Sequence, residues 1–203
     1  MDYSEDFTSK YLSKPNNDGG YKINDPVQES IRTSDMNDLN EFMNHKNPIV
    51  RKNVARNPHI TSTHIDKLLD DDKNYVRASA AKHHKCSSEN ISKALDDEDS
   101  SVRSYAADNP NATPEHIDKA LDDHNVFVRE SAANNHNATK ENLDKALADD
   151  NIYVRGNAAL NPNATKEHLT NALFGKDDWV RGAALSNQNY DRFFPNGHLG
   201  HIQ

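Results

Sequence analysis

The sequence repeats itself with a period of 26 residues. A Val-Arg pair recurs at this spacing without any insertion or deletion. The pairs are Val50-Arg51, Val76-Arg77, Val102-Arg103, Val128-Arg129, Val154-Arg155 and Val180-Arg181. A fixed period of this length is typical of solenoids, in which each unit is too small to fold alone and packs against its neighbours.

Each repeat encodes two short helices. Thr113 occupies a position that is Thr or Ser in five successive units, where a hydroxyl can cap a helix. Glu115 follows in the first turn, where it complements the helix dipole. Ile117 and Leu121 then mark one apolar stripe, and a second helix begins near Val128. The pattern predicts an all-α fold, a right-handed α-solenoid of short helix pairs.

The repeat also predicts the boundaries along the chain. We expect an N-terminal arm or extension over residues 1–28 and a capping helix over 29–50. Five repeats should occupy 51–180, and a C-terminal cap and tail should occupy 181–203. The arm carries aromatic residues, so it could pack on the solenoid or bind a partner.

Composition narrows the classes of function. The 203 residues carry a formal net charge of −8 and one cysteine. An acidic chain argues against a nucleic-acid partner, because such proteins neutralise phosphates with Lys and Arg. No apolar stretch approaches the roughly 20 residues that span a bilayer, and the first residues do not form a secretory signal. We therefore expect a cytoplasmic protein without membrane contact.

An Asp lies six residues before the Arg of several repeats. The pairs are Asp71 with Arg77, Asp97 with Arg103, Asp123 with Arg129 and Asp149 with Arg155. This arrangement resembles the HEAT repeats, and the short period with its Val-Arg and Asn-Pro phrases resembles the leucine-rich repeat variant family. The resemblance covers roughly residues 29 to 190. The units are shorter than HEAT units, and the cysteine cluster of the iron–sulfur member of the variant family is absent.

The resemblance implies a ladder in which Asp and Arg side chains bond across neighbouring units. Arg51 and Arg181 complete the arginine column at its two ends. A row of arginines could also bind phosphate, but a position that repeats in every unit is more typical of a stacking contact.

Function should therefore reside where the repeats differ. Four positions of the second helix face outward, those of residues 127, 130, 131 and 134 in one repeat, and the resemblance places this helix on the concave face. The candidate partner-binding residues are Arg56, Tyr75, Tyr105, Phe127, Tyr153 and Trp179. Exposed Tyr and Trp dominate binding sites. Tyr75, Phe127, Tyr153 and Trp179 share one column, which adjoins the buried valine. For these four residues the sequence favours a second interpretation, in which their aromatic rings seal the core.

Histidines could indicate a metal site, and the densest cluster is His83-His84-Lys85-Cys86. The spacing of a zinc site is missing, so we expect no metal and no cofactor. His64, His116 and His168 recur at one position, which we expect to be solvated. Three Asn-Ala-Thr segments match the glycosylation sequon, but a turn and a helix cap also explain them.

No nucleophile–base pair or phosphate loop is present. The sequence therefore favours a non-enzymatic interaction or scaffold module that binds a protein partner. Two alternatives remain: an enzyme of the HEAT-like DNA glycosylase or bilin lyase type, and an acidic decoy of a nucleic-acid-binding protein. The sequence specifies neither the partner nor the oligomeric state.

Overall fold

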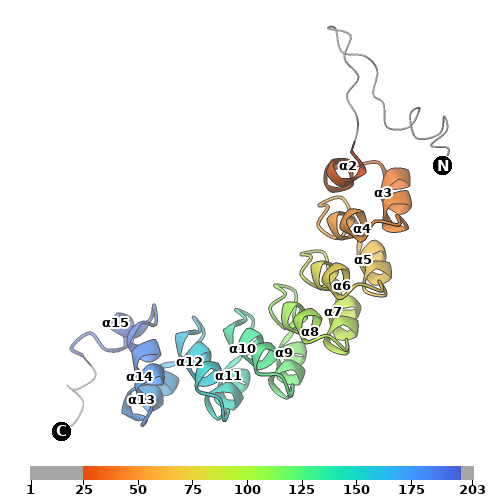
Figure 1. Cartoon of the computed structure of the whole chain (residues 1–203). Coiled ribbons are helices and arrows are strands. Elements are labelled where there is room, and N and C mark those ends of the chain that lie inside the picture. Colours follow the sequence, from red (N-terminus) through yellow and green to blue (C-terminus); the bar gives the residue numbers. More distant parts are fainter. Residues whose placement is uncertain (1–24, 198–203) are drawn as a thin grey trace, which may run out of the picture. The chain divides into compact units, whose positions relative to one another are not determined.

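The computed structural model describes residues 25–197, and all regular structure within that range is helical. The chain divides into two compact units, Met1–Ala80 and Ala81–Gln203. Each unit is a stack of short helix pairs, so the fold is the α-solenoid that the 26-residue period predicts (Figure 1).

The first unit contains α2 to α6. Their bounds are α2 Pro26–Arg32, α3 Met36–Met43, α4 Pro48–Val54, α5 Ser62–Leu68 and α6 Asn74–Ala81, whose last residue already belongs to the second unit. Helices α2, α3 and α4 pack against one another. The expected arm over 1–28 overlaps α2, and residues 1–24 lie outside the described part of the chain.

The expected single capping helix over 29–50 is instead the end of α2, all of α3 and the start of α4. The chain leaves the helical conformation at Thr33, where ψ is 137°. Asp35 then caps α3, accepting a hydrogen bond from the backbone N–H of Asn37 at 2.7 Å. Asn47 caps α4 in the same way. Three caps within 23 residues therefore divide the segment into three helices.

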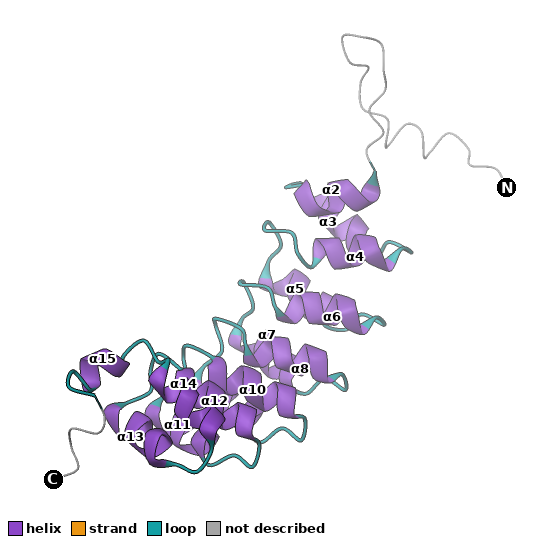
Figure 2. Cartoon of the chain, turned by 60° about the vertical axis from the view of Figure 1, so that its left-hand side comes forward, coloured by secondary structure: helices purple, strands orange, loops and turns teal. Residues whose placement is uncertain are grey.

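The second unit contains α7 to α15. Their bounds are α7 Ser88–Leu95, α8 Ser100–Ala107, α9 Pro114–Leu121, α10 Val126–Asn134, α11 Lys140–Leu147, α12 Ile152–Leu160, α13 Lys166–Phe174, α14 Asp178–Leu185 and α15 Tyr190–Phe193. The odd-numbered helices α7 to α13 form one layer and α8 to α14 form the other (Figures 1 and 2). The expected boundary at residue 181 falls inside α14.

Capping boxes start the first helices α5, α7, α9, α11 and α13. The Thr or Ser side chain accepts from the third helical N–H, whose own side chain accepts from the Thr or Ser backbone N–H. An Asn or Asp caps most of the second helices, as Asn125 caps α10. Helices of seven to nine residues are marginal alone, so the caps fix their limits and stacking stabilises them.

Repeated apolar columns form the core. Ile117 and Leu143 on the first helices are fully buried, as are Val128 and Val154 on the second helices. Small alanines fill the second-helix interfaces and permit close approach. At the C-terminal end Phe194 is buried, and the Lys166 ammonium lies 5.5 Å from the centre of its ring.

Candidate functional site

The arginine column is engaged inside the chain. Arg129 donates from Nε and Nη2 to the Asp149 carboxylate, at 2.7 and 3.0 Å, and from Nη1 to the Asp123 backbone carbonyl at 3.1 Å. Arg103 bonds Asp123 in the same bidentate way, and Arg51 bonds Asp71. Each arginine therefore contacts the backbone carbonyl of one repeat and the carboxylate of the next.

The end of the arginine column differs. Gly175 replaces the expected aspartate, and Arg155 bonds Asp177 at 2.6 Å instead. Arg181 donates to Gly175 and pairs with Asp178 on its own helix. Because these guanidinium donors already have partners within the chain, the geometry disfavours the phosphate-binding interpretation.

A ladder of buried asparagines, which the sequence interpretation missed, lies at the C-terminal ends of the second helices, whereas the arginines lie near the N-terminal ends. Asn135 donates from Nδ2 to the carbonyls of Ala107 and Asn109, at 2.7 and 3.1 Å, and accepts from the N–H of Asn137. Asn109, Asn161 and Asn187 make equivalent bonds. The signal for this ladder is the recurrence of Asn every 26 residues at this position.

A second asparagine column contains the glycosylation sequons. Asn137 donates to the carbonyls of Pro110 and Ala112, at 2.7 and 3.0 Å. Asn111 and Asn163 bridge two carbonyls in the same manner. The three side-chain amides thus join neighbouring turns, which gives the Asn-Ala-Thr segments a structural role.

The expectation that His64, His116 and His168 are solvated is wrong. All three are buried, and Nδ1 of each ring accepts the backbone N–H of the capping Thr at 3.1 Å. The rings also reach the preceding repeat, where His116 Nε2 lies 2.9 Å from Ser92 Oγ and His168 Nε2 lies 2.9 Å from Asp144 Oδ1. Burial lowers the pKa of His64 and of His116.

The side chains that the stacking contacts leave exposed include a row of aromatic rings. Phe127 on α10 is 65% exposed, Tyr153 on α12 is 55% exposed and Trp179 on α14 is 52% exposed. We call these three residues the aromatic row. They occupy the same position in three successive repeats of the second unit, on helices that pack against one another (Figure 2). The interpretation that they seal the core is therefore wrong.

Neighbouring residues hold the end of the aromatic row. The rings of Tyr153 and Trp179 meet edge to face, with centroids 6.1 Å apart. Trp179 also lies over Gly156, where a Cβ atom would stand 2.8 Å from indole Cδ1 and still closer to Nε1. The sequence interpretation missed Gly156, although glycine inside a helix is unfavourable relative to Ala and therefore indicates a packing requirement.

The electrostatic character of this face is mixed. Tyr105 on α8 is 39% exposed, with the Lys82 ammonium 5.1 Å from the centre of its ring. Burial raises the pKa of Asp108 and of Glu130, which lie on the same side of α8 and α10. With two carboxylates among these residues, the face lacks the continuous positive charge that a DNA-binding groove requires.

The first unit contributes the remaining candidates separately. Tyr75 on α6 is 38% exposed, and the Lys52 ammonium lies 5.9 Å from the centre of its ring. Arg56 is exposed just after α4. Ile49 occupies the Tyr75 position one repeat earlier and is also exposed.

The His83–Cys86 turn has a packing role. Cys86 is buried, its Sγ lies 3.5 Å from the Ala81 carbonyl, and burial raises the pKa of the thiol to about 11. The rings of His83 and His84 stack at 4.5 Å. Within residues 25–197 no three His, Cys, Asp or Glu side chains gather closely enough to hold a metal ion.

The helices of the described part of the chain are all too short or too polar to cross a bilayer. The helix pairs are joined by hydrogen-bonded turns throughout residues 25–197. Because the backbone groups of the turns are hydrogen-bonded within the chain, another molecule would bind mainly to side chains on the surface of the packed helices.

No family model and no curated protein matches the sequence. Several solved structures are similar to the chain, including the following two. One is a leucine-rich repeat variant described as having a novel repetitive structural motif, with a TM-score of 0.59 and 23% identity over 80% of this chain and 70% of that chain. The other is YibA of Escherichia coli, with a TM-score of 0.50 and 20% identity over 83% of this chain and 76% of that one. The chain therefore has the α-solenoid fold of the leucine-rich repeat variant and related helical repeat proteins.

Proposed function

We propose that the chain is a non-enzymatic module that binds a partner protein through the aromatic row. The observation that carries the proposal is the exposure of Phe127, Tyr153 and Trp179 at one repeated position. Large aromatic side chains offer much contact area for little loss of conformational freedom, and they are enriched at binding hot spots. Three of them in register form a surface suited to apolar side chains of a partner.

The packing beneath the row supports the same proposal. Trp179 packs against the ring of Tyr153 and against Gly156, so part of the rotational freedom of its side chain is already lost before binding. The polar groups of the stacking columns are bonded within the chain. The row and its neighbour Tyr105 are thus the binding surface in the second unit, and Tyr75 with Arg56 is a separate candidate in the first.

Alanine variants test the proposal. The tagged wild-type chain, Phe127→Ala and Trp179→Ala would be used to capture partners from a lysate of the native host, followed by mass spectrometry. Phe174→Ala is the matched control, because Phe174 is an aromatic of 56% exposure on α13, outside the row. We expect each row variant to recover at least about tenfold less of a specific partner, as loss of a hot spot predicts.

Circular dichroism would first establish that each variant is folded. Equal recovery by wild type and by both row variants would place the binding surface elsewhere. Equal loss in Phe174→Ala would indicate general adhesion to exposed aromatic rings, which also contradicts the proposal.

A further inference from the structure

A column of lysines on the first helices pairs with carboxylates of the preceding repeat. Lys119 Nζ lies 2.6 Å from Asp96 Oδ1, which is 23 residues earlier. Lys145 Nζ lies 2.9 Å from Asp118 Oδ1, 27 residues earlier, and 2.8 Å from Asp122 Oδ2. The repeat thus places one or two carboxylates opposite each of these ammonium groups.

Lys67 on α5 occupies this column in the first unit, but both partner positions have changed. The residues 23 and 27 positions earlier are Asn44 and Asn40, which carry neutral amides. Each amide donates to a backbone carbonyl of α3, Asn40 to Met36 at 2.7 Å and Asn44 to Asn40 at 2.9 Å. Among the described residues, Lys67 forms no ion pair.

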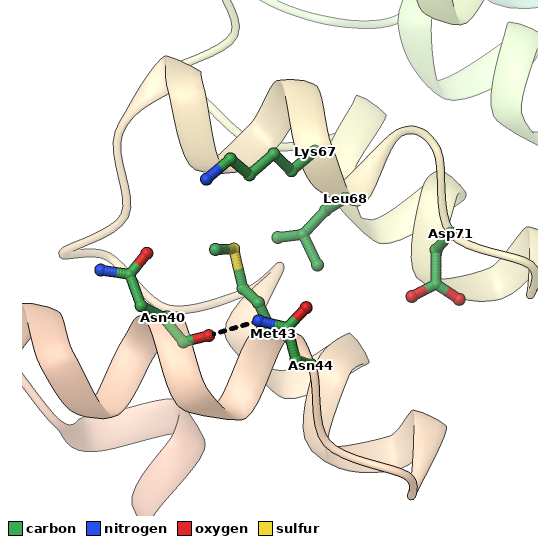
Figure 3. Close-up of a pocket in the computed structure, with 6 residues that line it drawn as sticks. All are labelled: Asn40, Met43, Asn44, Lys67, Leu68 and Asp71. Carbon is green, nitrogen blue, oxygen red and sulfur yellow. Dashed lines mark hydrogen bonds between the residues drawn. The ribbon is translucent and has the colours of Figure 1, made fainter.

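These residues line an open pocket of about 300 Å³ between α3 and α5. Figure 3 shows the Lys67 side chain extending across the pocket, with its amino group on the side of Asn40. Met43 and Leu68 form the apolar floor. Asp71 lies at the opposite end, where it accepts two hydrogen bonds from Arg51, so its charge is already compensated.

A pocket at the equivalent place in the second unit also coincides with a missing Lys–Asp pair. Asn171 replaces the lysine on α13, and a pocket of about 340 Å³ opens beside it. There Asp144 is paired with Lys140 and His168, at 2.8 and 2.9 Å. Both pockets therefore lie where the Lys–Asp pair is missing. Of the two, the pocket between α3 and α5 leaves its charged group uncompensated.

We propose that the pocket lined by Lys67, Asn40 and Asn44 binds an aspartate or glutamate side chain of a partner peptide. The carboxylate takes the place that Asp118 and Asp122 take beside Lys145. An exposed ion pair contributes little by itself, so a free anion would not be held. A peptide adds apolar contacts with the Met43 side of the floor, which makes it the suitable carrier. The site is separate from the aromatic row.

An NMR titration of the full chain tests the site. The probe is the peptide acetyl-Ser-Leu-Glu-Leu-Ser-amide, and the negative control has Gln in place of Glu. We expect the Glu peptide to shift the side-chain amide signals of Asn40 and Asn44 and the backbone amide of Lys67. The Gln peptide and inorganic phosphate should leave these signals in place.

Three variants that each lower the net charge by one separate the site from general electrostatics. Lys67→Gln removes the cation, and Asn40→Asp supplies the internal carboxylate that Lys145 has in Asp118. Both should weaken peptide binding by about twofold to fivefold, the loss of one exposed ion pair. Lys119→Gln changes a paired lysine of the same column and should bind as the wild type does.

Several outcomes would overturn the proposal. They are no shift with the Glu peptide, equal shifts with the Gln peptide or with phosphate, and equal weakening in Lys119→Gln. Concentration-dependent shifts of the same signals without peptide would assign the pocket to a second copy. Shifts caused by neutralising Glu5 and Asp6 would assign it to the chain's own N-terminal residues. Both results contradict a partner peptide as the occupant.

Discussion

A single buried amide joins each turn of the second unit to the turn before it. Asn135 satisfies two carbonyls and one N–H with one side chain, and it is almost fully buried. Only an amide offers two donors and an acceptor in so small a volume. The exposed Asn137 makes bonds of similar length to two other carbonyls, so the pair separates the effect of burial from that of hydrogen bonding.

Replacing Asn135 with Ala should destabilise the chain by about 2–4 kcal/mol, since buried carbonyls would lose their donors without gaining water. Asn137→Ala should lower the free energy of unfolding by about 1 kcal/mol or less, because water can replace the exposed amide as donor to the two backbone carbonyls. Urea unfolding followed by circular dichroism measures both free energies. Equal losses would show that burial is not the deciding factor.

Glycine makes room for the indole ring at the end of the aromatic row. A methyl group at Gly156 would overlap Trp179, whereas one at Gly182 would meet nothing within 4 Å. Both glycines lie inside helices, where Ala is favoured by about 1 kcal/mol. The two positions therefore differ mainly in the presence of the tryptophan.

Gly156→Ala should displace Trp179 into water and move its fluorescence emission to longer wavelength, which is readily measured because the chain has one tryptophan. Gly182→Ala should leave the emission unchanged and stabilise the chain by about 0.5–1 kcal/mol. An unchanged spectrum in Gly156→Ala would mean that the glycine does not position the indole.

At the scale of the helix, one capping position alternates between two residue types. His64, Asn90, His116, Asn142 and His168 occupy it in successive repeats, and each completes a capping box. In His116 the acceptor is Nδ1, so the neutral ring carries its proton on Nε2, facing Ser92. A second proton on Nδ1 would abolish the cap.

This chemistry predicts loss of stability in mild acid. Burial holds the pKa of His64 and of His116 below the ordinary 6.5, so the unfolded chain binds protons first as the pH falls. The contribution of these two histidines to the free energy of unfolding is complete above pH 6.5. It declines as the pH falls from 6.5 towards the lowered pKa values. The double variant His64→Asn/His116→Asn should keep the capping boxes and show a smaller decline.

Urea unfolding at pH 7.5 and at pH 5 measures the difference. At pH 7.5 the free energy of unfolding of the double variant should be lower than that of the wild type by about 1 kcal/mol or less. This difference is the cost of losing the hydrogen bond between His116 and Ser92. The same decline in both proteins would assign the acid sensitivity to other groups.

The helix pairs could be predicted from the sequence because caps and apolar stripes are local signals. Thr113 and Ile117 mark the start and the buried face of α9 without reference to the rest of the chain. The burial of His116 could not be predicted this way, because it depends on Ser92 in the preceding repeat. Three-dimensional stacking likewise decides that Phe127 stays exposed while the adjacent Val128 is fully buried.

At the scale of the whole molecule, side-chain hydrogen bonds link each turn of the second unit to the turn before it. Asn135 donates to the backbone carbonyl of Asn109, and Asn161 donates to that of Asn135. A defect in one turn therefore alters the acceptor of the next turn directly. Turns three repeats apart, such as those of Asn109 and Asn187, share no partner among these bonds.

Double-mutant cycles should reveal this nearest-neighbour architecture. Asn109→Ala and Asn135→Ala should couple by more than about 0.5 kcal/mol, since loss of the first loosens the carbonyl that the second uses. Asn109→Ala and Asn187→Ala should add within about 0.3–0.5 kcal/mol. The free energies of unfolding of the wild type, the three single variants and the two double variants give both coupling energies. Coupling of equal size in the two cycles would mean that the second unit responds as one body, because strain would then spread beyond the adjoining turn.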